Sequence, residues 1–75
     1  MQQNKNGNNI LMLACKDHKE VAIAIINSDK CTTEVLMQQE KNGQNALMIV
    51  FIFQPKAAIA IINSSICTTE VLMQQ

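Results

Sequence analysis

Apolar and polar residues alternate in blocks along this chain, and the apolar blocks predict short helices. The first block covers residues 10–16 and returns at 46–53. Each copy follows an asparagine, Asn9 or Asn45, whose side chain can accept a hydrogen bond from a free N–H of a first helical turn. The loop before each copy contains Asn-Gly, a strong turn signal. We therefore predict a turn followed by a helix in both places.

Two further helices are predicted in each half. The second begins near Lys19 and runs to Ile26, and in the other half Pro55 suits the first helical position, where its missing N–H costs nothing. This helix is apolar nearly all round, so it needs cover on several sides, as a helix between neighbouring repeats has. Thr32 and Thr68 can each cap a short third helix that ends at the following Met.

The block at 46–53 has a second interpretation. Taken alone it suits a buried strand, because a short apolar run of this kind is ambiguous between strand and helix. Its alignment with the capped segment 10–15, which contains Ala14, favours a helix. The chain is therefore expected to be all-α.

The chain contains an internal sequence repeat: two similar segments follow one another with a period of 36 residues. Met1-Gln2-Gln3 returns at 37–39 and again at 73–75, and the segments 22–28 and 31–36 return at 58–64 and 67–72. Self-similarity at such a period is typical of stacked repeats, in which each unit covers the apolar face of its neighbour. We predict a single repeat domain over residues 1–75, with unit one at about 1–36 and unit two at about 37–72.

Gly7, followed by the segments 9–15 and 20–27, resembles the ankyrin repeat. That family has a turn glycine, a first helix of the form Thr-Pro-Leu-His-x-Ala-Ala, and an apolar second helix. Leu11 and Ala14 fall on the leucine and alanine of its first helix. The resemblance implies a helical repeat solenoid of two helix-turn-helix units, each with an extra short helix. It also implies a protein that is not an enzyme and that binds a partner protein through its turns and first helices.

The chain departs from the ankyrin pattern at several positions. Ile10 and Ala46 replace the proline, and Met12 and Met48 replace the histidine. The glycine between the helices is absent, and the unit of 36 residues is longer than the family's usual length of about 33. Tetratricopeptide-like arrays are the nearest rival, but they lack an Asn-Gly turn ahead of a capped helix.

Composition and charge exclude several classes of partner. Six Lys balance six acidic residues and there is no Arg, which argues against nucleic acid and anionic membranes, since these need clustered cations. The apolar stretch 46–62 is interrupted by polar residues, so we do not expect it to span a membrane. The three cysteines form an odd set behind a polar start, which favours reduced thiols in the cytoplasm. The core must be aliphatic, because Phe51 and Phe53 are the only aromatic residues.

The largest break in the repeat points to a contact surface. Where unit one has Lys16 and Asp17, unit two has Ile52 and Phe53, an exchange of charged for bulky apolar side chains. Exposed apolar clusters of this kind mark contact sites. Alternatively, Phe51 or Phe53 fills a gap in the core. Both interpretations can hold together, with Phe51 inward and Phe53 outward. Adaptable methionines and turn residues complete the predicted set. The predicted partner-binding residues are Ile52, Phe53, Met12, Met48, Lys16 and His18.

No residue pattern in the chain predicts catalysis, a metal or a cofactor. His18 stands three residues after Cys15, a spacing that would bring them together on a helix. A thiolate–imidazole nucleophile also needs a third orienting group and an oxyanion pocket, and neither is evident. The cysteines lack the paired spacing of a zinc site.

Two units without polar caps pose an energetic problem. Solenoids are stabilised by contacts between neighbouring units, and usually need about three of them. A last unit that leaves Ile59, Ile61 or Ile62 in water loses about 1.5–3 kcal/mol for each side chain left unburied. Flanking repeats or other copies of the chain must cover such faces. We therefore expect self-association of the isolated chain, by head-to-tail stacking into an oligomer or filament.

Overall fold

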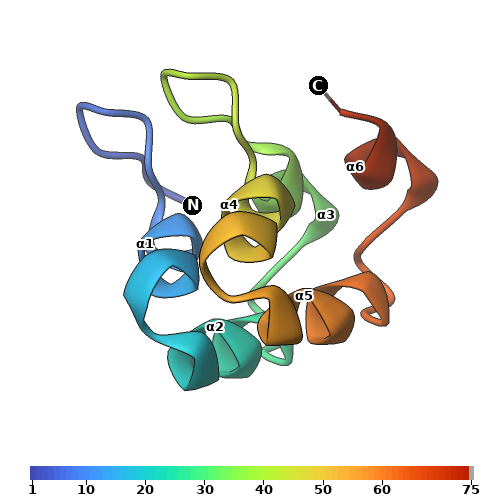
Figure 1. Cartoon of the computed structure of the whole chain (residues 1–75). Coiled ribbons are helices and arrows are strands. Elements are labelled where there is room, and N and C mark those ends of the chain that lie inside the picture. Colours follow the sequence, from blue (N-terminus) through green and yellow to red (C-terminus); the bar gives the residue numbers. More distant parts are fainter. Residues whose placement is uncertain (75) are drawn as a thin grey trace.

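The computed structural model describes residues 1–74, and over that range the chain is all-helical, with six helices and no strand (Figure 1). Unit one contains α1 (Ile10–Asp17), α2 (Lys19–Ile26) and α3 (Thr33–Met37). Unit two contains α4 (Ala46–Phe53), α5 (Pro55–Ile62) and α6 (Thr69–Met73). The helical interpretation of residues 46–53 is confirmed, and the strand alternative is wrong.

The first helix of each unit starts at its predicted asparagine cap. The Asn9 side-chain oxygen accepts the Met12 N–H at 2.8 Å, and Asn45 accepts the Met48 N–H at 2.9 Å. Pro55 is the first residue of α5, also as predicted. These caps satisfy backbone donors that the first helical turn leaves without a partner, which is why the helices begin where they do.

The two short third helices differ in their caps. The Thr32 hydroxyl accepts the Val35 N–H at 3.4 Å, as expected. Thr68 makes no side-chain cap bond, and its buried hydroxyl has no hydrogen-bond partner among residues 1–74. The cap predicted at Thr32 is therefore confirmed, whereas the one predicted at Thr68 is wrong.

Equivalent helices of the two units lie side by side. α4 packs beside α1, α5 beside α2, and α6 beside α3, while the first and second helices of each unit also pack against one another (Figure 1). The loops ahead of α1 and α4 project together from one edge of the molecule (Figure 1). Each helix of unit two therefore lies beside its counterpart in unit one.

The two projecting loops touch through their backbones. Gly7 and Gly43 have φ of +83° and +84°, the left-handed region that glycine enters without strain. The Lys41 N–H donates to the Asn6 carbonyl at 3.0 Å, which links the second loop to the first. A Cβ atom on Gly7 would lie 2.8 Å from the Glu40 Cα, so the absence of a side chain there permits the close approach.

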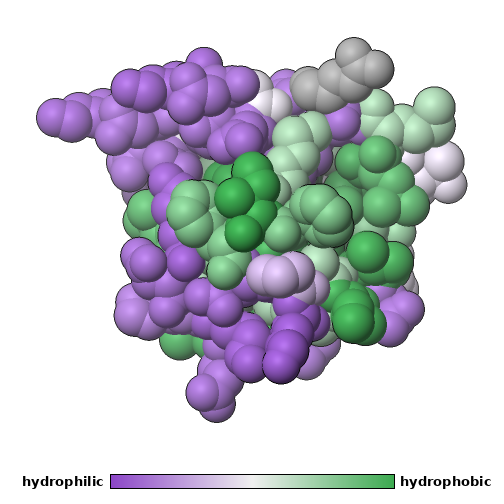
Figure 2. Space-filling model, viewed as in Figure 1, coloured by the Kyte–Doolittle hydropathy of each residue, from purple (hydrophilic) through white to green (hydrophobic). Residues whose placement is uncertain are grey.

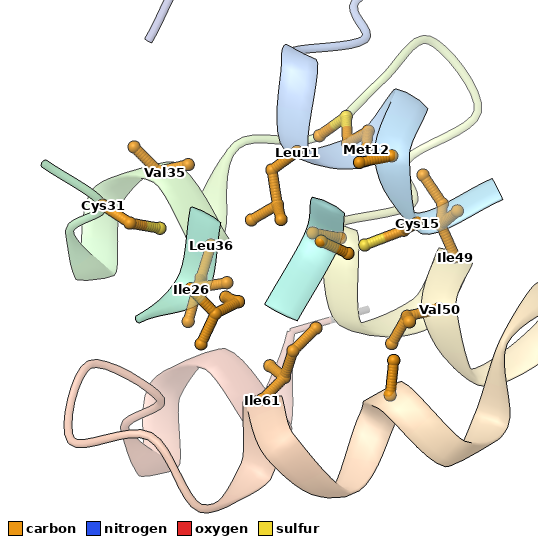
Figure 3. Close-up of a cluster of buried hydrophobic side chains, with 14 of the residues drawn as sticks. Leu11, Met12, Cys15, Ile26, Cys31, Val35, Leu36, Ile49, Val50 and Ile61 are labelled. Atoms are coloured by element: carbon orange, nitrogen blue, oxygen red, sulfur yellow. The ribbon is translucent and has the colours of Figure 1, made fainter. Parts of the chain in front are cut away.

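The core runs through both units and is aliphatic, as the composition predicts. Leu11, Cys15, Leu36 and Ile49 are fully buried in one cluster that Figure 3 shows at the junction of the units. Because Phe51 is 69% exposed and Phe53 is 51% exposed, neither phenylalanine belongs to that core. The proposal that one of them fills a core gap is therefore wrong.

Candidate interaction surface

Four of the six predicted contact residues come together at one end of α1 and α4. The Gln54 side-chain amide donates to the Lys16 carbonyl over a long 3.5 Å, which holds the α4–α5 turn against the end of α1. Ile52 is 59% exposed and Phe53 is 51% exposed, His18 is exposed and Lys16 is half-buried. We call Lys16, His18, Ile52 and Phe53 the turn patch. Whether this patch binds a partner stays a prediction.

The two predicted methionines lie in the first turns of α1 and α4, away from the turn patch. Met12 is fully buried, and its sulfur accepts the Asn9 N–H at 3.5 Å. It has no surface to offer a partner, so its place among the contact residues is wrong. Met48 is half-buried at the equivalent place. The difference arises because unit two covers the first turn of unit one, whereas within residues 1–74 no further unit follows unit two to cover Met48.

Phe51 faces solvent for the same reason. Its counterpart Cys15 is fully buried, because α4 packs beside α1, but within residues 1–74 no equivalent helix follows α4. The arrangement with Phe51 inward and Phe53 outward is therefore wrong. Both phenylalanines are exposed.

The remaining exposed apolar side chains fall on the two end faces of the stack. We call Met1, Ile10, Leu13 and Val21 the leading face, and Phe51, Ile59, Ile62, Leu72 and Met73 the trailing face; each is between 43% and 73% exposed. Figure 2 shows apolar residues gathered over α4, α5 and α6, beside the hydrophilic loops. Ile59 and Ile62 are left in water as expected, whereas Ile61 is only 1% exposed.

The arrangement of the described side chains gives little support to a catalytic or metal site. Residues 1–74 form no pocket, and hold no group of three or more His, Cys, Asp or Glu that could bind a metal. Burial, with a smaller contribution from the neighbouring Cys31, raises the pKa of the Cys15 thiol to about 12. The pKa values of Cys31 and Cys67 are also raised by burial. Cys15 is therefore a neutral thiol inside the core, not a thiolate paired with His18.

The helices of the described range have at most eight residues each. A helix that crosses a membrane needs about 20 consecutive apolar residues. None of the helices in residues 1–74 is therefore long and apolar enough to span one.

Sequence reasoning missed a polar clasp that links the units. The Gln38 side chain accepts the Asn9 amide at 2.8 Å and donates to the Met1 carbonyl at 2.8 Å. In unit two, the Gln74 side chain accepts the equivalent bond from the amide of Asn45, the residue that caps α4, also at 2.8 Å. The signal was available, because the Asn and Gln of each clasp are 29 positions apart in both units. Hydrogen-bonded amides in a half-buried setting favour one register between the units.

Comparison with known proteins finds no protein-family model, curated protein or solved structure that matches the chain.

Proposed function

We propose that this chain is a protein-interaction module built of two ankyrin-like units that form neighbouring turns of a helical solenoid. Equivalent helices lie side by side, and each unit begins with a turn glycine and an asparagine-capped first helix. Both features support the resemblance, since an ankyrin unit places its turn and first helix along one surface. The three free thiols, two of them buried, support a reducing compartment such as the cytoplasm.

The turn patch is the observation that carries this proposal. Ile52 and Phe53 each leave at least half of a large apolar side chain in water. The fold does not require apolar residues there, because unit one holds Lys16 and Asp17 at the equivalent positions. An exposed aromatic beside an aliphatic side chain is typical of an interface anchor, and such anchors carry most of the free energy of binding.

The surroundings of the patch indicate the kind of partner. Lys16 and His18 belong to the patch and exposed Asp17 stands between them in the sequence, so a complementary surface would place an apolar recess against Phe53 and polar groups around it. Nucleic acid and membranes are poor candidates, because the formal net charge of the chain is zero and it has no Arg. The proposed partner is thus another protein, and no catalysis or cofactor is involved.

Photo-crosslinking from position 53 tests the proposal. A benzoylphenylalanine in place of Phe53 should form adducts with a different protein in cells, and excess unlabelled chain should compete them away. The Phe53→Asp chain should fail to compete while keeping the helical circular dichroism of the parent, since Phe53 lies outside the core. Its melting temperature should fall modestly, because about half of the Phe53 side chain is buried.

The same probe at exposed Glu34, on α3, is the matched control. Identical adducts from positions 34 and 53 would contradict a specific site at the turn patch. Adducts of only twice the chain's own mass would do so too, because they report a second copy and no other protein. Unfolding of the Phe53→Asp chain would show that Phe53 stabilises the fold.

A further inference from the structure

The two end faces of the molecule are the two halves of its own internal interface. From this we propose that the chain binds a second copy of itself head to tail, with the trailing face of one molecule covering the leading face of the next. This contact goes beyond the proposed function and uses none of the turn-patch residues.

The trailing face corresponds to the side of unit one that unit two already covers. Leu36 is 0% exposed and its counterpart Leu72 is 53% exposed. Ile26 is 4% exposed and its counterpart Ile62 is 50% exposed. The local sequences around each pair are nearly identical, so the difference in burial is due to the presence or absence of a following unit. A following unit is therefore the kind of surface that fits the trailing face.

The leading face corresponds to the side of unit two that packs on unit one. Ala46 and Ile49 are 0% exposed, whereas their counterparts Ile10 and Leu13 are 60% and 45% exposed. Unit one of a second copy thus exposes the same side that unit two of this molecule uses to pack on unit one. The contact between units one and two therefore indicates how two copies of the chain would pack.

Polar groups of the projecting loops match in the same register. Within the molecule, the Lys41 N–H of the second loop donates to the Asn6 carbonyl of the first at 3.0 Å. In a head-to-tail pair, the Lys5 N–H of the second copy would be placed to donate to the Asn42 carbonyl of the first. The formal net charge of the chain is zero, so no long-range repulsion opposes the approach.

Two changes make the external contact a looser version of the internal one. Phe51 stands where unit one has Cys15, and Ile10 stands where unit two has Ala46, so both faces are bulkier than their counterparts in the contact between units one and two. The helices of two molecules must therefore stand further apart than α1 and α4 do. We expect a reversible contact that builds up with concentration.

The register also creates a conflict at the chain start. Met73 and Gln74 occupy the place where Met1 and Gln2 of a following copy would lie, because these residues are the same position of successive repeats. The second copy must move its first residues aside. This requires breaking the bond from the Gln38 amide to the Met1 carbonyl.

Sedimentation velocity on the 75-residue chain, from low to high micromolar concentration, tests the contact. The weight-average mass should rise above 8.3 kDa and pass twice that value, because unlike faces continue beyond a dimer. Ile10→Glu on the leading face and Ile59→Lys on the trailing face should each weaken association by about tenfold or more. Both residues are at least 60% exposed, so the fold should persist by circular dichroism.

Mixing the two variants distinguishes head-to-tail stacking from a two-fold contact. Each variant keeps one intact face, so the mixture should form a pair of twice the chain mass that grows no further. Asn27→Lys, at a position exposed in both units, is the control and should associate like the parent. A folded parent that stays monomeric throughout would overturn the proposal. So would a mixture that associates no better than its components.

A deletion tests the register by itself. Removing Met1 and Gln2 relieves the overlap with Met73 and Gln74, so the dissociation constant should fall by several-fold. Gln3 is kept, because its side-chain amide donates to the Gly7 and Gln39 carbonyls and so holds the first loop. Unchanged or weaker association of the folded deletion chain would show that a second copy does not continue the repeat. Neither result depends on whether Phe53 binds another protein, so failure here leaves the proposed function standing.

Discussion

Replacing the same leucine in the two units should have very different consequences. Leu36 and Leu72 occupy identical local sequences, Thr-Thr-Glu-Val-Leu-Met, in the equivalent helices α3 and α6. Leu36 is 0% exposed and Leu72 is 53% exposed. Helix propensity, neighbouring residues and the effect on the unfolded chain are therefore matched, and only the tertiary surroundings differ.

The magnitudes follow from that burial. Truncation to Ala removes about three carbons, each worth roughly 0.8 kcal/mol when fully buried. Leu72→Ala, at half burial and with no cavity left behind, should cost about 1 kcal/mol. Leu36→Ala loses the full transfer free energy and leaves a cavity, so it should cost about 3 to 5 kcal/mol. The two free energies of unfolding should differ by about 2 kcal/mol or more.

Urea denaturation followed by far-ultraviolet circular dichroism measures both values, since the chain has no Trp or Tyr for fluorescence. The titrations belong at low micromolar concentration, where a second copy does not cover Leu72. A domain of this size has about 5 kcal/mol of stability or less, so Leu36→Ala can leave it largely unfolded. Ile26→Val and Ile62→Val, at 4% and 50% exposure, form a gentler pair with the same expected order.

Equal costs within either pair, in a chain shown to be monomeric, would refute the reasoning. They would mean that the trailing face is covered within the molecule, or that unit two does not shield unit one. Growth of the Leu72→Ala cost with protein concentration would instead report cover by another copy.

Two other predictions concern a loop and a thiol. Gly7→Ala should lower the melting temperature more than Gly43→Ala: both positions have positive φ, but an added Cβ lies 2.8 Å from the Glu40 Cα at Gly7 and meets nothing within 4 Å at Gly43. Equal shifts would contradict the close contact of the loops. The Cys15 thiol has its ordinary pKa of 9.0 in the unfolded chain and a pKa of about 12 in the folded one. Its contribution to the free energy of unfolding should therefore be complete below pH 9 and fall by up to about 1.4 kcal/mol per pH unit toward pH 12. Urea titrations across that range should show a smaller slope in Cys15→Ala, and an equal slope would show that the thiol does not contribute.

The helix starts were predictable because local chemistry sets them. Asn9 and Asn45 cap their helices with side-chain bonds that need no tertiary information, and Pro55 fixes its own backbone at the first position of α5. The end of α1 was placed one residue early, at 16, whereas the helix continues to Asp17. Helix ends depend on weaker signals, and such a difference is small.

The orientation of α4 was not predictable in the same way. Every residue from Ala46 to Phe53 is apolar, so no stripe of polar residues marks the side that faces water. The inward side, with Ile49 and Val50, is determined by contact with α1 and α5, which is a property of the assembled fold. This is why the sequence left open whether Phe51 faces the core or the solvent.

One shared boundary holds this molecule together, and that makes the number of units a variable in its own right. An isolated first unit would have no neighbour at all and should be unstructured, while a covalent tandem of four units would contain three such boundaries. Stability per residue would rise along that series with no change of amino-acid type. The stability of the fold can therefore be raised by duplication alone, one unit at a time.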